Sequence, residues 1–239
     1  MTEIFTILAL TIASGGCIPL GGLIASFEHI RPHWLQREFR HFLIALGGGI
    51  LLGAVAVVLI PEGIARMERS LFSIPLFLFG GCLFFLIERA LGLRRRESPQ
   101  LMGMILDYLP EAIALGGMVA VSSPLAPLLA LLIGLQNLPE GFNTYRELIA
   151  HNRSNRRTVL KVMGAMVLIG PLAGLVGYLF LSGYPALLGG IMLFASGGIV
   201  YLIFQDVAPQ ARLKRHWGPP LGAVVGFSIA MFSEMLVVA

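Results

Sequence analysis

Long apolar runs separated by short polar breaks extend along the whole chain. A helix that spans a membrane needs ~20 mostly apolar residues. Runs of that length predict eight spans, at about residues 4–27, 42–62, 72–93, 101–121, 125–145, 159–182, 185–208 and 218–238. The breaks carry proline, glycine, serine or charge, as in Ser122-Ser123-Pro124 and Gly218-Pro219-Pro220, and such residues favour turns. The pattern predicts an all-α membrane protein, an eight-transmembrane-helix bundle that occupies residues 1–239 as a single domain.

The composition agrees with a multi-pass protein of the cell's inner (plasma) membrane, with the lipid bilayer as its main partner. Hydrophobic residues make up 56% of the 239 residues and charged residues only 13%, unlike a soluble domain of this size. Cys17 and Cys82 both lie in apolar runs, so we expect them to pack as small apolar side chains without a disulfide. No HExxH, Gly-x-Ser-x-Gly or P-loop motif occurs. We therefore expect neither an enzyme, nor an organic cofactor, nor a nucleic-acid partner.

The basic residues predict the orientation of the spans. All Lys and Arg residues except Arg66 and Arg69 fall at the breaks after the first, third, fifth and seventh predicted spans. Basic residues concentrate on the cytoplasmic side of membrane proteins. This asymmetry places both termini outside the cytoplasm.

Two matching segments interrupt the fourth and fifth predicted spans with polar side chains. One is Asp107-Tyr108-Leu109-Pro110-Glu111-Ala112 and the other is Gln136-Asn137-Leu138-Pro139-Glu140-Gly141. In each, a polar side chain stands four residues before a carboxylate, so the two share a helix face, and a proline directly precedes the carboxylate. Ionisable groups at the bilayer centre cost about 2.5–3.5 kcal/mol or more each, so they usually mark a substrate path. The pair of segments predicts two helices that face one polar site near the midplane.

The chemistry of these segments suits a divalent cation. Pro110 and Pro139 lack an N–H, so the carbonyls of Leu106 and Leu135 lose their helical partner. Carboxylates, amides and freed carbonyls all offer oxygen, which hard divalent ions prefer. Three simpler interpretations stay open, namely water on the freed carbonyls, protonated carboxylates of structural role, and prolines that only kink their helices.

Other carboxylates lie at the ends of predicted spans. Asp206 ends the seventh span, either as a third contributor to the site or as a partner of Arg212. Glu62 stands next to Arg66 as a solvated helix end or a functional group, and Glu88 is expected to pair with Arg89 or to reach the interface. A weak internal echo relates Leu59-Ile60-Pro61-Glu62 to Val207-Ala208-Pro209-Gln210, and repeats are common in transporters.

The segment from Gln136 to Gly141 resembles the His-Asn-x-Pro-Glu-Gly signature of the ZIP (Zrt/Irt-like) family of metal transporters. The segment from Asp107 to Ala112 is similar to the first, degraded copy of that signature. Residues 197–201 with 205–209 resemble the family's seventh span, and residues 81–89 resemble its third. By these segments the chain resembles a divergent, bacterial-type member.

This resemblance implies a transporter that moves a divalent metal ion, zinc in the family, towards the cytoplasm through a binuclear site between the fourth, fifth and seventh spans. Carried over residue by residue, the metal ligands are Asp107, Glu111, Gln136, Asn137, Glu140 and Asp206. Tyr108 stands where the family has Asn and receives no role. Relatives often form homodimers, which the residues themselves do not show.

Two departures from the signature bear on the choice of metal. Asp107 and Gln136 stand where the family has imidazoles, and no histidine lies within a predicted span. Imidazole suits zinc, whereas an oxygen-only set suits Mn²⁺, with Fe²⁺ between them; Cd²⁺ is a further substrate to compare. Two rival functions stay open, a proton-linked transporter of a small solute that uses Glu111 and Glu140, and a membrane sensor that binds metal without transporting it.

Overall fold

The structure is a computed structural model that describes residues 2–28, 33–91, 99–152, 155–213 and 217–238. Within these residues the chain is helical, with turns and no strand. The elements in order are α1 (Thr2–Phe27), α2 (His33–Ala54), the π-helical turn η1 (Val55–Leu59), α3 (Ile60–Arg66), α4 (Ser73–Leu91), α5 (Pro99–Ala120), α6 (Ala126–Asn152), α7 (Arg156–Met166), α8 (Ile169–Leu181), α9 (Pro185–Leu202), the π-helical turn η3 (Ile203–Val207), α10 (Ala208–Ala211) and α11 (Leu221–Val238).

Within the described residues helix covers most of each predicted range, and the all-α class is confirmed. In the described part of the chain, six helical stretches are long and apolar enough to cross a membrane: Thr2–Phe27, Arg37–Arg66, Ser73–Ala90, Leu101–Ala120, Arg156–Leu181 and Pro185–Ala211. The apolar part of α11 is shorter, at Leu221–Val237. The fifth predicted range forms α6, which has 27 residues but carries many polar side chains. The architecture is that of an α-helical, multi-pass membrane protein.

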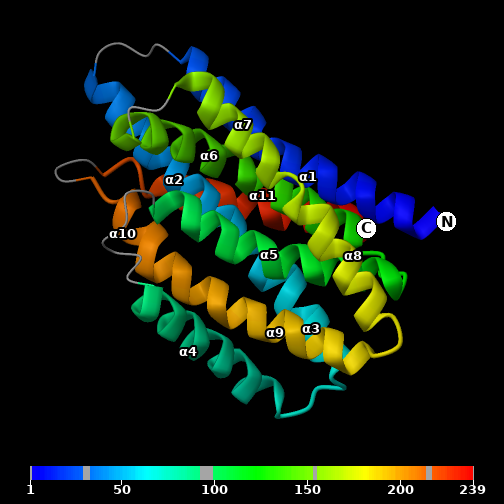
Figure 1. Ribbon diagram of the computed structural model, residues 1–239. Helices are drawn as coiled ribbons and strands as arrows, with labels where there is room; N and C mark the ends of the chain where they lie inside the picture. The colour runs from blue at the N-terminus through cyan, green and yellow to red at the C-terminus, as the bar shows by residue number, and fades with distance from the viewer. Residues whose placement is uncertain (1, 29–32, 92–98, 153–154, 214–216, 239) are drawn as a thin grey trace.

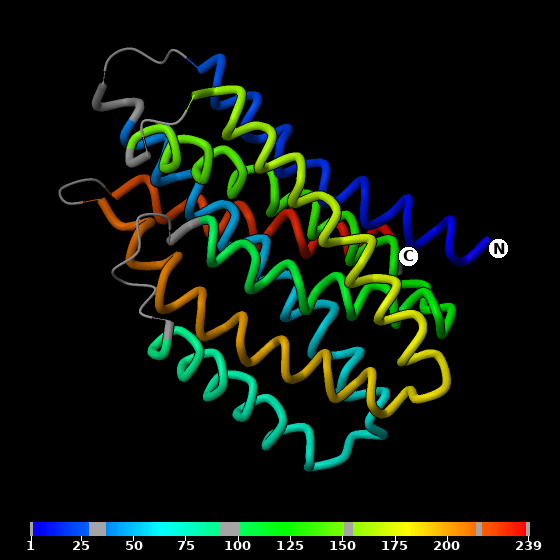
Figure 2. The backbone as a smooth tube through the Cα atoms, in the orientation of Figure 1, coloured from blue at the N-terminus to red at the C-terminus, as the bar shows by residue number. Residues whose placement is uncertain are grey.

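The helices lie side by side along a common direction, as Figure 1 shows. The α4 helix lies at one edge against α9, and α1 lies with α7 at the opposite edge. Both chain ends lie at the same end of the bundle, together with the turns that join α3 to α4, α5 to α6 and α8 to α9 (Figure 2). The closest pairs join helices that are far apart in sequence: α1 with α6, α2 with α11, α5 with α8, and α4 with α9.

Glycines allow these four pairs to pack backbone against backbone. A Cβ atom added at Gly21 of α1 would lie 2.1 Å from the carbonyl oxygen of Leu138 in α6, and one at Gly141 would lie 2.2 Å from that of Ile18. The same close approach recurs in the other pairs, at Gly49, Gly222 and Gly226 for α2 with α11, Gly116 and Gly177 for α5 with α8, and Gly80 and Gly197 for α4 with α9. Small residues play this part in membrane bundles, where packing replaces the hydrophobic drive between helices.

Three consecutive glycines place α2 at the centre of the bundle. Cβ atoms added at these positions would meet three different elements: at Gly47, Pro139 of α6 at 3.2 Å; at Gly48, Val207 of η3 at 2.5 Å; and at Gly49, the carbonyl oxygen of Ala223 in α11 at 2.2 Å. The α2 helix therefore joins α6, η3 and α11, and two of these elements carry predicted site residues.

Each π-helical turn stands directly before a proline-containing helix. The N–H of Ile60 donates to the carbonyl of Val55, and the N–H of Ala208 donates to that of Ile203. Both bonds span five residues, which is the π pattern, and such turns inside α-helices are frequent at functional sites. The internal echo of the sequence thus corresponds to a repeated backbone feature.

The glycine contacts predict a selective sensitivity of α1. Gly21→Ala should lower the free energy of unfolding by about 1–3 kcal/mol, because the added methyl must push α1 away from the backbone of α6. Thermal unfolding of the detergent-solubilised protein measures this change. Gly16→Ala on the same helix is the matched control, since a Cβ there meets nothing within 4 Å, and it should be neutral or stabilising by up to about 1 kcal/mol. Equal effects of the two substitutions would contradict the packing.

Candidate functional site

Three predicted carboxylates line one small cavity. Asp107 comes from α5, Glu140 from α6 and Asp206 from η3, and Gln210 of α10 lies beside them. Gly103, Met104, Leu202 and Val207 complete the wall of this cavity of about 40 Å³. That volume is enough for a water molecule or a small ion. Asp206 therefore lies at the same cavity as Asp107 and Glu140, although it stands 66 positions after Glu140 in the sequence.

Glu111 and Gln136 form the direct link between α5 and α6. The Gln136 Nε2 amide donates to Glu111 Oε2 at 2.7 Å, and both side chains are fully buried. Glu140 lines the cavity together with Asp107, one helical turn from Glu111 on α5. The two matching segments thus face each other, as their polar faces predict, and Gln136 takes one oxygen of Glu111 while leaving the other unbound.

Asn137 points away from this link and towards α1. Its Nδ2 donates to the carbonyl oxygen of Ser14 at 3.1 Å. The carbonyl oxygen of the Asn137 side chain is buried without a hydrogen-bond partner. Of the predicted ligands, Asn137 is therefore the one whose amide is engaged in holding α6 to α1.

Several buried oxygens of the site have no hydrogen-bond donor. They are Asp107 Oδ1, Glu111 Oε1, Gln136 Oε1, Asn137 Oδ1 and Glu140 Oε2. Buried polar atoms almost always have a partner, so each exception needs an explanation. All five atoms are acceptors, a set that a cation or a water satisfies.

Among the described residues, no cationic side chain forms a salt bridge with Asp107, Glu111 or Glu140. The two salt bridges found among the described residues, Arg66 with Glu62 and Arg146 with Glu28, involve other carboxylates. In the same part of the chain, no three His, Cys, Asp or Glu side chains lie close enough together to hold a metal ion. The site is a set of oxygens around a cavity, with amides as well as acids, rather than a compact cluster of three metal-ligating side chains.

Tyr108 packs, in agreement with its lack of an assigned role. The ring is fully buried, and its hydroxyl donates to the carbonyl of Thr11 at 3.2 Å. The hydroxyl fits between two glycines, since a Cβ at Gly15 would lie 2.4 Å from it and one at Gly170 only 2.0 Å. Tyr108 therefore fixes α5 against α1 and α8 beside the polar segment.

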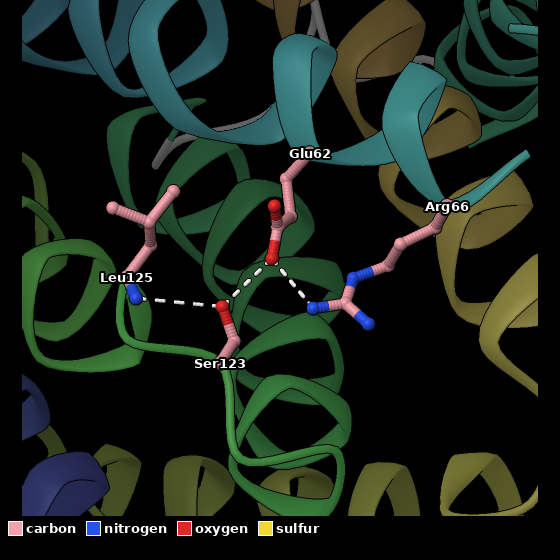
Figure 3. Close-up of polar contacts among 4 residues, drawn as sticks. All are labelled: Glu62, Arg66, Ser123 and Leu125. Atoms are coloured by element: carbon pink, nitrogen blue, oxygen red, sulfur yellow. Dashed lines mark hydrogen bonds and ion pairs between the residues drawn. The ribbon is translucent and has the colours of Figure 1, made fainter. Parts of the chain in front are cut away.

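Glu62 closes the opposite end of the bundle, where the turn between α5 and α6 lies. Figure 3 shows its Oε1 accepting from Ser123 Oγ at 2.7 Å and from Arg66 Nη2 at 2.5 Å. The N–H of Leu125 donates in turn to Ser123 Oγ at 3.4 Å. Glu62 is thus partly buried and bound, not a solvated helix end, because the turn before α6 folds over it.

Glu88 also differs from the expectation that it pairs with Arg89. The Tyr201 hydroxyl of α9 donates to Glu88 Oε2, and the carboxylate is almost fully buried. The cause is the close packing of α4 on α9, which turns Glu88 inward while Arg89 stays exposed. Neighbouring positions of a helix point in different directions, so the two side chains part.

Sequence reasoning missed the polar continuation of α6. Asn143, Thr144 and Glu147 are all buried, and Asn143 Nδ2 donates to the carbonyl of Pro139 at 2.9 Å. Their spacing from Glu140 follows the helical repeat, which was the available signal. The apolar pattern predicts that the fifth span ends at residue 145 and that a polar break follows. In the structure α6 continues to Asn152.

Comparison with known proteins identifies no relative of this chain. No protein-family model matches the chain, and no curated protein matches it either. The likeness to the metal transporters therefore rests on the segments quoted above.

The Gln136–Glu111 contact predicts a coupled effect on stability. Gln136→Leu should lower the free energy of unfolding by about 1–3 kcal/mol, because it leaves a buried carboxylate without its donor. In the double variant with Glu111→Leu this loss should largely disappear, since both polar partners are gone. Thermal unfolding of the single and double variants measures the coupling. Simple additivity of the two single effects would show that the side chains do not interact.

Proposed function

We propose that this chain is a membrane transporter that carries a divalent metal ion towards the cytoplasm. The observation that carries the proposal is the cavity where Asp107, Glu140 and Asp206 meet from three helical segments of an otherwise apolar bundle. Acids at that depth are costly, and they persist in membrane proteins mainly where they line a substrate path. A divalent ion would supply Asp107 and Glu140 with the positive charge that no side chain in the described part of the chain brings to them.

The donor set favours a hard ion over a soft one. Every predicted ligand offers oxygen. The unbound acceptors belong to Glu111, four residues after Asp107, and to Gln136 and Asn137, four and three residues before Glu140. Oxygen ligands suit Mn²⁺, with Fe²⁺ next, whereas the zinc of the ZIP-like resemblance has more affinity for imidazole. We therefore rank Mn²⁺ and Fe²⁺ beside Zn²⁺ as substrates, with Cd²⁺ as a probe.

The proposed topology has eight spans with both termini outside the cytoplasm. Both chain ends lie at one end of the bundle in Figure 1, which an even number of crossings requires. Arg66 and Arg69 belong to the α3–α4 turn region at that end, whereas Arg146 and Arg156 belong to the opposite end. The positive-inside rule supports a cytoplasmic position for the second end. In this arrangement α6 is the fifth crossing helix and α11 the eighth, in addition to the six long apolar stretches.

No nucleotide-binding motif is present in the sequence, so the proposed transport follows the gradient of the ion. Movement of the ion requires α5 and α6 to shift against the rest of the bundle. Residues of α5, α6 and η3 line the cavity, and α2 contacts α6 at Gly47 and η3 at Gly48. The prolines of α5 and α6 and the π-helical turn of η3 are the places where the helical hydrogen bonds already deviate, so they are the natural hinges.

Removal of one acid should abolish transport while leaving the fold intact. Glu140→Gln keeps the shape of the side chain and removes its charge, so metal uptake into proteoliposomes should fall by ~100-fold or more, as expected when a ligand is lost. Radioactive Mn²⁺ and Zn²⁺ uptake measures this change. Glu234→Gln in α11 is the matched control, because that carboxylate lies outside the cavity.

The outcomes separate the proposal from its rivals. Saturable uptake that is lost in Glu140→Gln and kept in Glu234→Gln supports a metal transporter. If folded protein takes up no metal but carries protons in a way that requires Glu111 and Glu140, the proton-linked transporter replaces the metal transporter as the proposed function. Tight metal binding without flux would replace it with the sensor.

Gln136 should control which metal is preferred. Gln136→His introduces the imidazole that the resembling signature carries, so the ratio of Zn²⁺ to Mn²⁺ uptake should rise on the order of 10-fold. Competition between the two ions in the same vesicles measures the ratio. An unchanged ratio, with uptake intact, would show that Gln136 does not contact the ion.

A further inference from the structure

An apolar groove runs between α1 and α2, with α6 as its floor. Side chains of four helices line it, among them Ile24 of α1, Leu43 of α2, Leu138 of α6 and Ile229 of α11. Its volume is about 660 Å³, which lies in the range of protein sites that hold a small molecule. Ile24 is 47% exposed, so the groove opens on the outer surface of the bundle, where a membrane protein meets lipid.

The groove has the length of one leaflet of a bilayer. Along α2 it extends from Phe39 to Ile50, a rise of about 17 Å at 1.5 Å per residue. The hydrocarbon core of a bilayer is about 30 Å thick, so that one leaflet supplies about 15 Å. Among the described lining residues only Glu28, at the end of the groove, carries a charge. The groove therefore fits the acyl chain of one lipid in both length and chemistry.

Arginine side chains surround the charged end of the groove. The guanidinium of Arg156, in the first turn of α7, stacks 4.3 Å from the centre of the Phe27 ring, and Phe27 lines the groove. Glu28 forms a salt bridge with Arg146 of α6, which balances the charge of the carboxylate. Arg156 then adds a positive charge at the mouth.

The wider charge balance at this end is also positive. The described residues of 28–40, 146–152 and 155–161 include six Lys or Arg and three Glu. These segments lie at the end of the bundle away from the termini, where α1 ends and α7 begins (Figure 1). A positive surface beside an apolar groove favours an amphiphile with an anionic headgroup over a zwitterionic one.

We infer that this groove is a binding site for an anionic phospholipid of the cytoplasmic leaflet. One acyl chain lies between α1 and α2, and the headgroup phosphate lies beside Arg156. The choice of leaflet follows from the proposed topology, because basic groups at the cytoplasmic surface attract anionic lipids. The binding itself does not depend on a transport function.

The bound lipid lies directly behind the candidate site. Pro139 lines the groove, and the next residue, Glu140, lines the oxygen-rich cavity. Because Pro139 lacks an N–H, α6 is missing a helical hydrogen bond at this point. An acyl chain packed on Leu138 and Pro139 supports the helix there. This effect on the cavity, unlike the binding, rests on the proposed transport function.

Lipid retention by the purified full-length protein tests the site. The protein is mixed in detergent with equal amounts of phosphatidylglycerol and phosphatidylcholine, and native mass spectrometry measures which lipid stays bound. Wild-type protein should retain phosphatidylglycerol about fivefold or more in preference. Ile24→Trp fills the groove and should remove this lipid, and Leu43→Trp fills it from α2 if the first variant does not fold. Ile12→Trp is the matched control, because Ile12 is 51% exposed on the same helix and lies outside the groove.

A second pair of variants tests the headgroup contact. Arg156→Gln should lower the preference for phosphatidylglycerol about fivefold, as expected for the loss of one basic side chain. Arg157→Gln removes the same charge from the next position, which points in another direction from α7, and it should keep most of the preference. Equal losses would show that diffuse surface charge, rather than a site, selects the lipid, and the inference would fail.

Uptake of Mn²⁺ measures the effect of the lipid on the candidate site. The vesicles consist of phosphatidylcholine alone or of an equal mixture with phosphatidylglycerol. The anionic lipid should raise uptake severalfold for the wild type and for Ile12→Trp, but not for Ile24→Trp. An equal rise in both variants would mean that the lipid acts through the charge of the membrane surface, which contradicts a role of the groove.

The results separate this inference from the proposed function. If wild-type protein shows no preference for phosphatidylglycerol, or if Ile24→Trp and Leu43→Trp retain it as the wild type does, the lipid site is wrong while the metal transporter stands. If the lipid binds as expected but wild-type protein takes up no metal, the lipid site stands and the proposed function fails. If Ile24→Trp separates a dimer without changing the bound lipid, the groove is an interface between two copies and the inference is wrong.

Discussion

Burial of acidic side chains among apolar helices is the constraint on which the rest of this structure depends. Asp107, Glu111 and Glu140 lie where desolvation penalises a charge strongly, and no basic side chain that the structure describes forms a salt bridge with them. The helices around them must therefore be held firmly enough that these groups stay inside. The hydrogen bond from Gln136 to Glu111 holds α5 and α6 together at this depth. The buried oxygens without a hydrogen-bond donor then determine what the cavity can bind.

Glycine supplies the rigidity that this burial requires. Polar side chains link α5 and α6 at few points. The positions of these helices are therefore set by α1 and α2, which pack closely on α6, and by α8, whose backbone contacts that of α5. Gly21 and Gly141 join α1 to α6, and Gly116 and Gly177 join α5 to α8. The polar site thus lies between two helices that are each fixed from behind by a close, apolar contact.

The sequence predicts the helices and the pairing of the polar segments well, because apolar length and helical spacing are local properties. It also places Asp107 and Glu140 at one site, since α5 and α6 are joined by a short turn. It does not predict the partner of Glu88 or the closure of Glu62 by Ser123, which depend on how distant helices pack. The buried face of Asn143 and Glu147 was missed for a similar reason: a polar run reads as a loop unless the surrounding helices are known to cover it.

The two π-helical turns show how one backbone feature serves two ends of the bundle. After η1 come Pro61 and Glu62, and Arg66 and Ser123 bind the Glu62 carboxylate at the end of the bundle that carries the termini. After η3 come Pro209 and Gln210, and the Gln210 side chain lines the cavity. Asp206 lies within the π-helical turn itself. A π turn adds one residue to a helical turn and so changes the direction in which the following side chains point. The segment after η1 forms the ion pair of Glu62 with Arg66. The segment formed by η3 and α10 adds the Asp206 carboxylate and the Gln210 amide to the oxygen-lined cavity.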